Sequence, residues 1–94
     1  MISLMITDSM IPFVNEGIKV RDEDFGLIVI SKRTPILTLN KDSTVIWKCI
    51  KGDCTIKQIC EKINNDYGFD SESNYKIVVE FLENCHKLGL VDFK

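Results

Sequence analysis

The stretch Leu37-Thr38-Leu39-Asn40-Lys41-Asp42-Ser43-Thr44-Val45-Ile46 marks the point at which the spacing of apolar residues changes. Before Asn40 the chain contains short runs rich in Ile, Val, Leu and Thr, which are typical of β-strands. After Asn40 apolar residues recur three and four positions apart, which is typical of helices that face a core. The change predicts a domain in which the strands come first and the helices follow.

Three apolar runs before Asn40 predict a three-stranded antiparallel meander. They cover residues 17–21, 25–31 and 34–39 and are separated by Asp22-Glu23-Asp24 and by Lys32-Arg33. We interpret the three consecutive acids as a solvated turn, because such runs are more often turns than cation sites. The second run contains Leu27-Ile28-Val29-Ile30 without polar alternation, so both faces of that strand are apolar.

Polar caps and glycines delimit three helices after Asn40. Thr55 is a good N-cap, and Gln58 stands at the capping-box position three residues later. The predicted helices run from Asp42 or Ser43 to Gly52, from Thr55 to Gly68, and from Ser71 or Ser73 to Gly89. A short segment, residues 90–93, follows.

The order of elements predicts an α+β, winged-helix-like fold with a three-stranded antiparallel sheet followed by a three-helix bundle. With 94 residues the chain is expected to form a single domain, residues 1–94, in which residues 1–14 could be a flexible or swapped N-terminal segment. The N-terminus has neither a basic start nor a long apolar stretch, so we expect no signal peptide, no membrane contact and a cytoplasmic protein.

Charge and motif content exclude several function classes. The chain has 12 basic and 14 acidic residues, without the basic excess that nucleic-acid binding requires. It has one histidine and no glycine-rich phosphate loop. His86 follows Cys85 directly, and adjacent helical residues point about 100° apart, so these two do not face each other as nucleophile and base. We therefore expect no catalytic residues and no cofactor.

The four cysteines are interpreted as free thiols rather than as a metal site. Cys49, Cys60 and Cys85 fall on apolar helical stripes, where a thiol behaves as a small buried hydrophobe. Their spacings do not form a zinc knuckle, so no metal site is expected. Cys54 falls in a predicted turn and is the thiol most open to reaction. Trp47 lies off the stripe of the first helix, as an anchor for a partner or as a residue packed under the sheet.

Between Pro12 and Val91 the sequence resembles the PqqD-like family, the recognition elements for precursors of ribosomally synthesised and post-translationally modified peptides. The match rests on the order and spacing of several short motifs rather than on any one of them. The motifs are Gly17-Ile-Lys-Val20, Ile28-Val-Ile30, Leu37-Thr-Leu-Asn40, Ser43-Thr44, Ile46-Trp47, Ile50-Lys-Gly52, Thr55-Ile-Lys-Gln-Ile59, Tyr67, Phe81-Leu82 and Leu88-Gly-Leu-Val91.

The resemblance implies a non-catalytic peptide chaperone. Members of the family bind the leader of a precursor peptide as an extra strand and present the peptide to a maturation enzyme, often a radical SAM protein or a peptidase. In this chain the extra strand would lie beside residues 34–39, in a groove shared with the third helix. The expected peptide-binding residues are Thr34, Ile36, Leu37, Thr38, Leu39, Tyr75, Lys76, Val79 and Leu82.

Two questions stay open at the level of sequence. The second face of the predicted sheet could be covered by Met1–Ile6, by a maturation enzyme or by a second copy of the chain in a homodimer. The order of elements also fits a winged-helix DNA-binding regulator. Lysines and acids alternate along the second and third predicted helices, however, and leave no basic face for phosphates.

Overall fold

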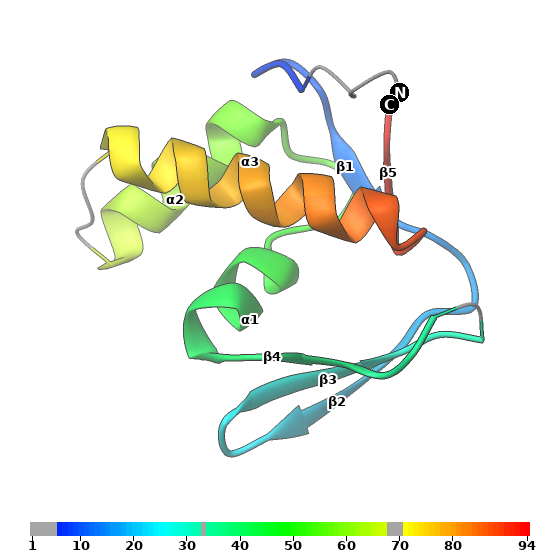
Figure 1. Cartoon of the computed structure of the whole chain (residues 1–94). Coiled ribbons are helices and arrows are strands. Elements are labelled where there is room, and N and C mark those ends of the chain that lie inside the picture. The colour runs from blue at the N-terminus through cyan, green and yellow to red at the C-terminus, as the bar shows by residue number, and fades with distance from the viewer. Residues whose placement is uncertain (1–5, 33, 68–70) are drawn as a thin grey trace.

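A computed structural model shows the three strands of the main sheet followed by three helices, as the change at Asn40 predicts, and adds one short strand near each end of the chain (Figure 1). It describes residues 6–32, 34–67 and 71–94. The strands are β1 (Pro12–Val14), β2 (Lys19–Glu23), β3 (Gly26–Ile30), β4 (Leu37–Leu39) and β5 (Val91–Phe93), and the helices are α1 (Lys41–Lys48), α2 (Ile56–Tyr67) and α3 (Ser71–Lys87). The α+β, winged-helix-like fold is therefore confirmed.

The main sheet is antiparallel, with the strand order β2-β3-β4. Its first strand extends through Asp22 and Glu23, so the prediction of a turn over all three acids was wrong. Glu23 pairs with Gly26 across a loop of two residues, Asp24 and Phe25. The acids are accommodated because Asp22 lies 3.1 Å from the Lys48 ammonium and Glu23 lies 2.8 Å from the Arg21 guanidinium.

The third predicted strand is shorter than residues 34–39. Only Leu37–Leu39 pair with β3, and residues 34–36 precede the strand. Pro35 offers no N–H to a sheet, which is consistent with pairing that begins beyond it. Leu37–Leu39 nevertheless form the outer strand of the sheet, as the meander requires.

A second, two-stranded sheet joins the ends of the domain. β1 pairs antiparallel with β5, in the register Pro12↔Phe93 and Val14↔Val91. Ahead of β1, the carbonyl oxygens of Asp8 and Met10 accept hydrogen bonds from the N–H groups of Lys57 and Ile56 at the start of α2. The described part of the N-terminal segment therefore packs on its own chain, while Met1–Met5 lie outside the described residues.

The helix boundaries follow their caps. Asn40, and not Asp42 or Ser43, is the N-cap of α1, because its Oδ1 accepts the Ser43 N–H at 2.8 Å. The capping box is confirmed: the Thr55 N–H donates to Gln58 Oε1 at 2.8 Å, and the Gln58 N–H donates to Thr55 Oγ1 at 3.2 Å. α3 begins at Ser71, whereas Gly68 lies outside the described residues.

The core lies between the helices and one face of the main sheet. Trp47 is 6% exposed within it, which supports packing over partner anchoring, and Cys49, Cys60 and Cys85 are buried there as free thiols. The core cluster comprises Leu27, Val29, Leu39, Ile46, Trp47, Cys49, Ile50, Ile56, Ile59, Cys60, Ile63, Val78, Leu82, Cys85, Leu90 and Val91. No described helix is both long and apolar enough to cross a membrane.

Candidate functional site

β4 is an outer strand of the main sheet, and its free edge lies on the same side of the fold as the helices' exposed apolar residues. β4 pairs with β3 on one side, and within the described ranges no strand pairs with its other side. An edge strand presents backbone N–H and C=O groups that can pair with another extended chain. β4 can therefore accept a further strand.

The side chains of β4 alternate as the sequence predicts. Leu39 is buried and Leu37 is half-buried on the face that meets the helices. Thr38 is exposed on the opposite face, and Ile36, just before the strand, is 66% exposed. A strand added to this edge would thus lie between an apolar, helix-facing side and an open side.

One flank of α3 faces α1 and the end of β4. Ile77 is 53% exposed, and it lines a pocket together with Asp42 and Val45 of α1. Phe81 and Leu88 lie within about 40° of Ile77 around the helix, so the three side chains form one apolar row. The Leu88 N–H donates to the Asn84 carbonyl oxygen at 3.1 Å, which continues the helical path to this residue.

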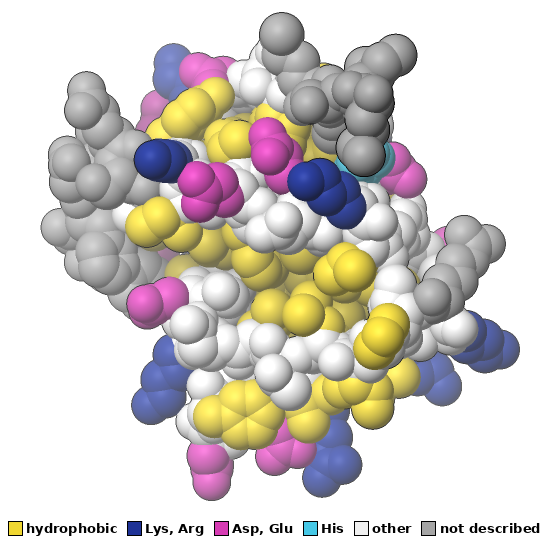
Figure 2. All heavy atoms as spheres, in the orientation of Figure 1, with side chains coloured by type: hydrophobic (Ala, Val, Ile, Leu, Met, Phe, Trp, Pro, Cys, Tyr) yellow, Lys and Arg dark blue, Asp and Glu magenta, His cyan; other side chains and the backbone are white. Residues whose placement is uncertain are grey.

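The row on α3 and the helix-facing side of β4 border a hollow in the surface. Figure 2 shows hydrophobic side chains gathered in this hollow, between the α3 band and the β4 band. At the α1 end it deepens into an apolar pocket of about 120 Å³, lined by Asp42, Val45, Ile46, Ile63, Asn74, Ile77 and Val78. We call the hollow and this pocket the α3–β4 groove. Its apolar lining suits an extended peptide with hydrophobic side chains.

The structure brings together the β4 part of the predicted peptide-binding set. Leu37, Thr38 and Leu39 form the open strand, with Ile36 exposed and Thr34 half-buried just ahead of it.

The predicted residues of α3 lie elsewhere. Tyr75 and Val79 are each about 160° from Ile77 around the helix, on the flank that faces the N-terminal segment. A hydrogen bond to Asp8 raises the pKa of Tyr75, and this contact shows that the Tyr75 side of α3 faces the N-terminal segment. Lys76 is exposed, and Leu82 is fully buried in the core. None of these four side chains lies on the groove side of α3.

The residues that sequence reasoning passed over are Ile77, Phe81 and Leu88. Their signal was present, because they widen the apolar stripe of the third helix beyond the arc that a core requires. An apolar stripe that is wider than the core requires leaves exposed apolar residues on both flanks of the helix, and the sequence does not say which flank faces the edge of the sheet. The position of α3 against α1 decides it.

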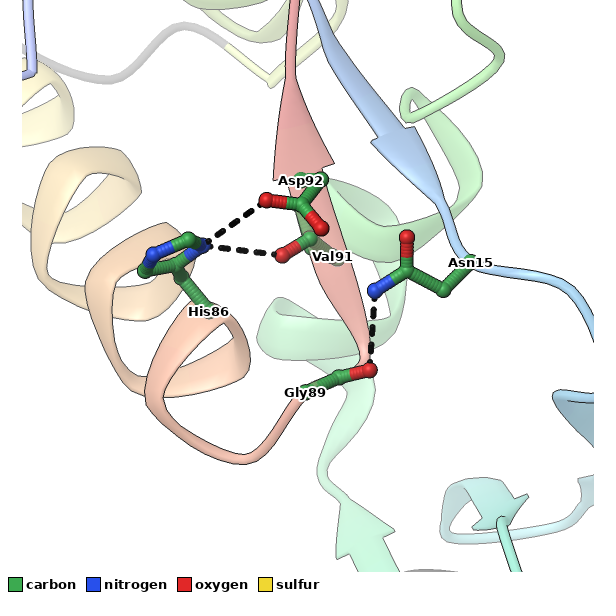
Figure 3. Close-up of polar contacts among 5 residues, drawn as sticks. All are labelled: Asn15, His86, Gly89, Val91 and Asp92. Carbon is green, nitrogen blue, oxygen red and sulfur yellow. Dashed lines mark hydrogen bonds and ion pairs between the residues drawn. The ribbon is translucent and has the colours of Figure 1, made fainter.

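The single histidine is held by β5 at the far end of α3 (Figure 3). His86 Nδ1 lies 3.1 Å from the Val91 carbonyl oxygen and 3.5 Å from the Asp92 carboxylate, and the ring lies 5.6 Å from that of Phe93. Cys85 points into the core, where burial raises the pKa of its thiol to about 12. This pair therefore lacks the contact and the thiolate that nucleophilic catalysis requires.

Metal ligands do not gather in the parts of the chain that the structure describes, where no three His, Cys, Asp or Glu side chains are grouped to hold an ion. Cys54 is half-buried, and its hydrogen bond to Asp53 raises the pKa of its thiol. The cysteines thus supply core volume rather than a recognisable ligand set.

The family model of PqqD, coenzyme PQQ synthesis protein D, matches residues 26–91. The chain belongs to the PqqD family. The matched region extends from β3 through α3 to the start of β5, so it contains both sides of the α3–β4 groove. No curated protein matches the sequence.

Three solved structures share the fold of this PqqD-family chain. The PqqD part of Methylobacterium extorquens PqqCD, described as a functional stand-alone recognition element for such modified peptides, has a TM-score of 0.79 at 14% identity and covers 94% of this chain and 95% of that one. TbiB1 in complex with the TbiA(beta) leader peptide has a TM-score of 0.76 at 14% identity, covering 85% and 94%. Lasso peptide synthetase B1 complexed with the leader peptide has a TM-score of 0.76 at 11% identity, covering 87% and 98%.

Proposed function

We propose that this chain is a non-catalytic peptide chaperone that binds the leader of a ribosomally synthesised precursor peptide and holds it for a separate maturation enzyme. The observation that carries the proposal is the open edge of β4 beside the apolar row of α3. Backbone pairing at such an edge supplies affinity, and the neighbouring pockets supply specificity for side chains.

The register predicts which backbone groups would pair with the leader. Glu23 and Gly26 flank a two-residue hairpin loop, where the flanking residues form the hydrogen-bonded pair. Hydrogen-bonded and non-bonded pairs alternate along antiparallel strands, and a central strand directs alternate residues to its two neighbours. Leu37 and Leu39 are then expected to bond to β3, which leaves the N–H and C=O of Thr38 for the leader.

The groove would recognise apolar leader side chains. Those that point toward the helices would meet Leu37, Ile77, Phe81 and Leu88, and the deepest would enter the pocket beside Ile63 and Val78. The proposed site therefore keeps Thr34, Ile36, Leu37, Thr38 and Leu39 from the sequence and takes its helical part from the other flank of α3. The core position of Leu82 gives it a supporting role behind this flank.

Leader complexes of two proteins with the same fold support this function. The PqqD match covers the segments that build the groove, and the stand-alone relative is described as a functional recognition element. We propose a radical SAM protein or a peptidase as the maturation enzyme, and a cytoplasmic site of action. By tethering the leader, the domain would raise the local concentration of the precursor at that enzyme.

The charge distribution disfavours the alternative of a winged-helix DNA-binding regulator. α2 carries Lys57 and Lys62 against Glu61 and Asp66, and the whole chain has a net charge of −2. A protein that neutralises several phosphates needs a basic stripe along the element that enters the groove of DNA.

The test is a titration of the isotope-labelled protein with synthetic leaders of short precursors encoded beside its gene. We expect saturable backbone amide shifts centred on residues 36–39 and 77–88. Retention on duplex DNA, with no shift caused by any of these leaders, would disprove the proposal.

A further inference from the structure

Three lysines from separate segments meet in a pocket behind the apolar end of the groove. Lys48 comes from α1, Lys51 from the connection between α1 and α2, and Lys62 from α2. The pocket has a volume of about 390 Å³, and among the described residues that line it Asp66 is the one carboxylate. This local excess of positive charge is notable in a chain whose acids outnumber its bases. We call it the lysine pocket.

Two of these lysines are available to a ligand. Lys48 is engaged by Asp22 at 3.1 Å, but Lys51 and Lys62 form no ion pair with any residue that the structure describes. Burial raises the pKa of the Cys49 thiol. The positive charges of Lys62 and Lys51 lower the same pKa by a smaller amount, so both ammonium groups lie near this thiol. Lys51 and Lys62, like Asp66, thus lie within electrostatic range of one thiol and line one pocket, where a carboxylate would be attracted by both lysines.

The lysine pocket is continuous with the α3–β4 groove. Val45 and Ile63 line both the lysine pocket and the apolar pocket at the α1 end of the groove. A strand that pairs antiparallel with β4, as β3 does, has its amino end beside Leu39 and the start of α1. Residues that precede the paired strand would therefore pass the apolar pocket and reach the lysine pocket.

Resting on the proposed function, we infer that the lysine pocket binds acidic residues of the leader that precede the strand paired with β4. The predicted ligand is thus an extended peptide in which Asp or Glu residues come before the apolar residues that enter the groove. Lys51 and Lys62 would bind the carboxylates, and Lys48 would contribute by its position beside them. This pocket adds a charge requirement to backbone pairing, which by itself is insensitive to sequence.

Peptide carboxylates suit this pocket better than a nucleic-acid backbone does. The charge is confined to one pocket, with Asp66 within it and Asp42 at the neighbouring apolar pocket, so a run of phosphates would also meet these carboxylates. Phosphate recognition gains its strength from many cations along a strand.

The experiment sorts a displayed library of random peptides, long enough to span both pockets, on the wild-type protein and on Lys51→Glu/Lys62→Glu. The matched control is Lys57→Glu/Lys87→Glu, which changes the net charge equally at exposed sites away from both pockets. We expect wild type and control to enrich Asp and Glu on the amino side of an apolar motif, and the lysine-pocket variant to lose this enrichment. Its affinity for the best acidic peptide should fall about tenfold, because two ion pairs become repulsions.

The outcomes separate this inference from the function on which it rests. If the library yields apolar motifs without acidic residues, or with acids only on the carboxyl side, the inferred role of the lysine pocket is wrong while the proposed peptide binding still holds. If the control variant loses as much affinity as the lysine-pocket variant, the loss is due to net charge alone, and the inferred role of the lysine pocket is again wrong. If a protein with a normal circular dichroism spectrum enriches no peptide, both the proposed peptide binding and the inferred role of the lysine pocket are wrong.

Discussion

Thr38 pairs with Ile28 across β4 and β3, and both side chains lie on the face of the sheet that points away from the helices. Thr38 is therefore the middle residue of an outer strand whose flanking leucines face the helices. This relationship separates the backbone of Thr38, which the proposed leader would use, from the side chains that stabilise the core.

Thr38→Pro should abolish leader binding and leave the fold largely intact. Proline removes the N–H that is expected to pair with the leader, while the outer side of an edge strand tolerates its ring. Thr38→Val is the matched control, because it keeps the N–H and a β-branched side chain. Binding measured by fluorescence anisotropy, beside far-UV circular dichroism, gives the answer. Undiminished binding by the proline variant would place the leader elsewhere.

Ile77→Ala should weaken leader binding by about five- to twentyfold, because an apolar contact in the groove is worth roughly 1–2 kcal/mol. Its stability should change little, since Ile77 is 53% exposed. Tyr75→Ala removes a side chain that is 37% exposed on the opposite flank of α3 and should leave the affinity unchanged. The reverse result would restore the helical residues expected from sequence. Titration calorimetry of both variants decides between the two flanks.

Leu82→Ala should lower the free energy of unfolding by about 2–5 kcal/mol, since it empties a fully buried position. Urea unfolding followed by circular dichroism measures the change. Leader affinity, measured below the unfolding transition, should stay near that of the wild type because Leu82 offers no surface to a peptide. Strong loss of affinity in a folded Leu82→Ala sample would show that the groove extends to this residue.

Gly26→Ala should destabilise the protein by about 2–4 kcal/mol. Gly26 has φ +149°, and a Cβ at this position would overlap the Leu39 carbonyl oxygen and the Asn40 backbone. The clash lies where β4 passes into α1, so the outer strand should also be disturbed. Gly17→Ala is the control: its φ is +82° but its surroundings are open, and about 1 kcal/mol is expected. Thermal unfolding of both variants tests the difference.

Stability should fall as the pH rises above about 9. Burial raises the pKa of Cys85 from 9.0 to about 12, and burial also raises the pKa values of Cys49 and Cys60. Between pH 9 and pH 12 the unfolded chain loses the Cys85 proton while the folded chain keeps it, so ionisation favours unfolding. This thiol contributes a slope of up to about 1.4 kcal/mol per pH unit. Urea unfolding of Cys85→Ala should show a shallower decline, and identical slopes would contradict the assignment.

The face of the main sheet that points away from the helices carries exposed apolar side chains. The sequence predicts a second strand that is apolar on both faces, and in β3 Ile28 is half-buried and Ile30 is 39% exposed on the face that points away from the helices. The described N-terminal residues pack at the start of α2 instead of over these side chains. A maturation enzyme or a second copy of the chain remains our proposal for the covering partner.

The sequence by itself determined the order of the main-sheet strands and the three helices, the burial of Cys49, Cys60 and Cys85, and the position of the outer strand. These features depend on local patterns: the change of apolar period at Asn40, the Thr55–Gln58 capping box, and the alternation of Leu37, Thr38 and Leu39. Short-range geometry fixes each pattern, so neighbouring residues are enough to predict it.

Only the tertiary structure decided which flank of α3 borders the groove, and that β1 pairs with β5. A helix with an apolar stripe wider than a core needs has two candidate borders, and the helix that packs beside it selects one. Here residues of α1 line a pocket together with Ile77, while Asp8 binds Tyr75 on the other side. The lysine pocket has the same origin, because Lys48, Lys51 and Lys62 meet only when α1 and α2 pack together. Contacts between distant segments depend on how all the elements fill one core, and no local pattern records that.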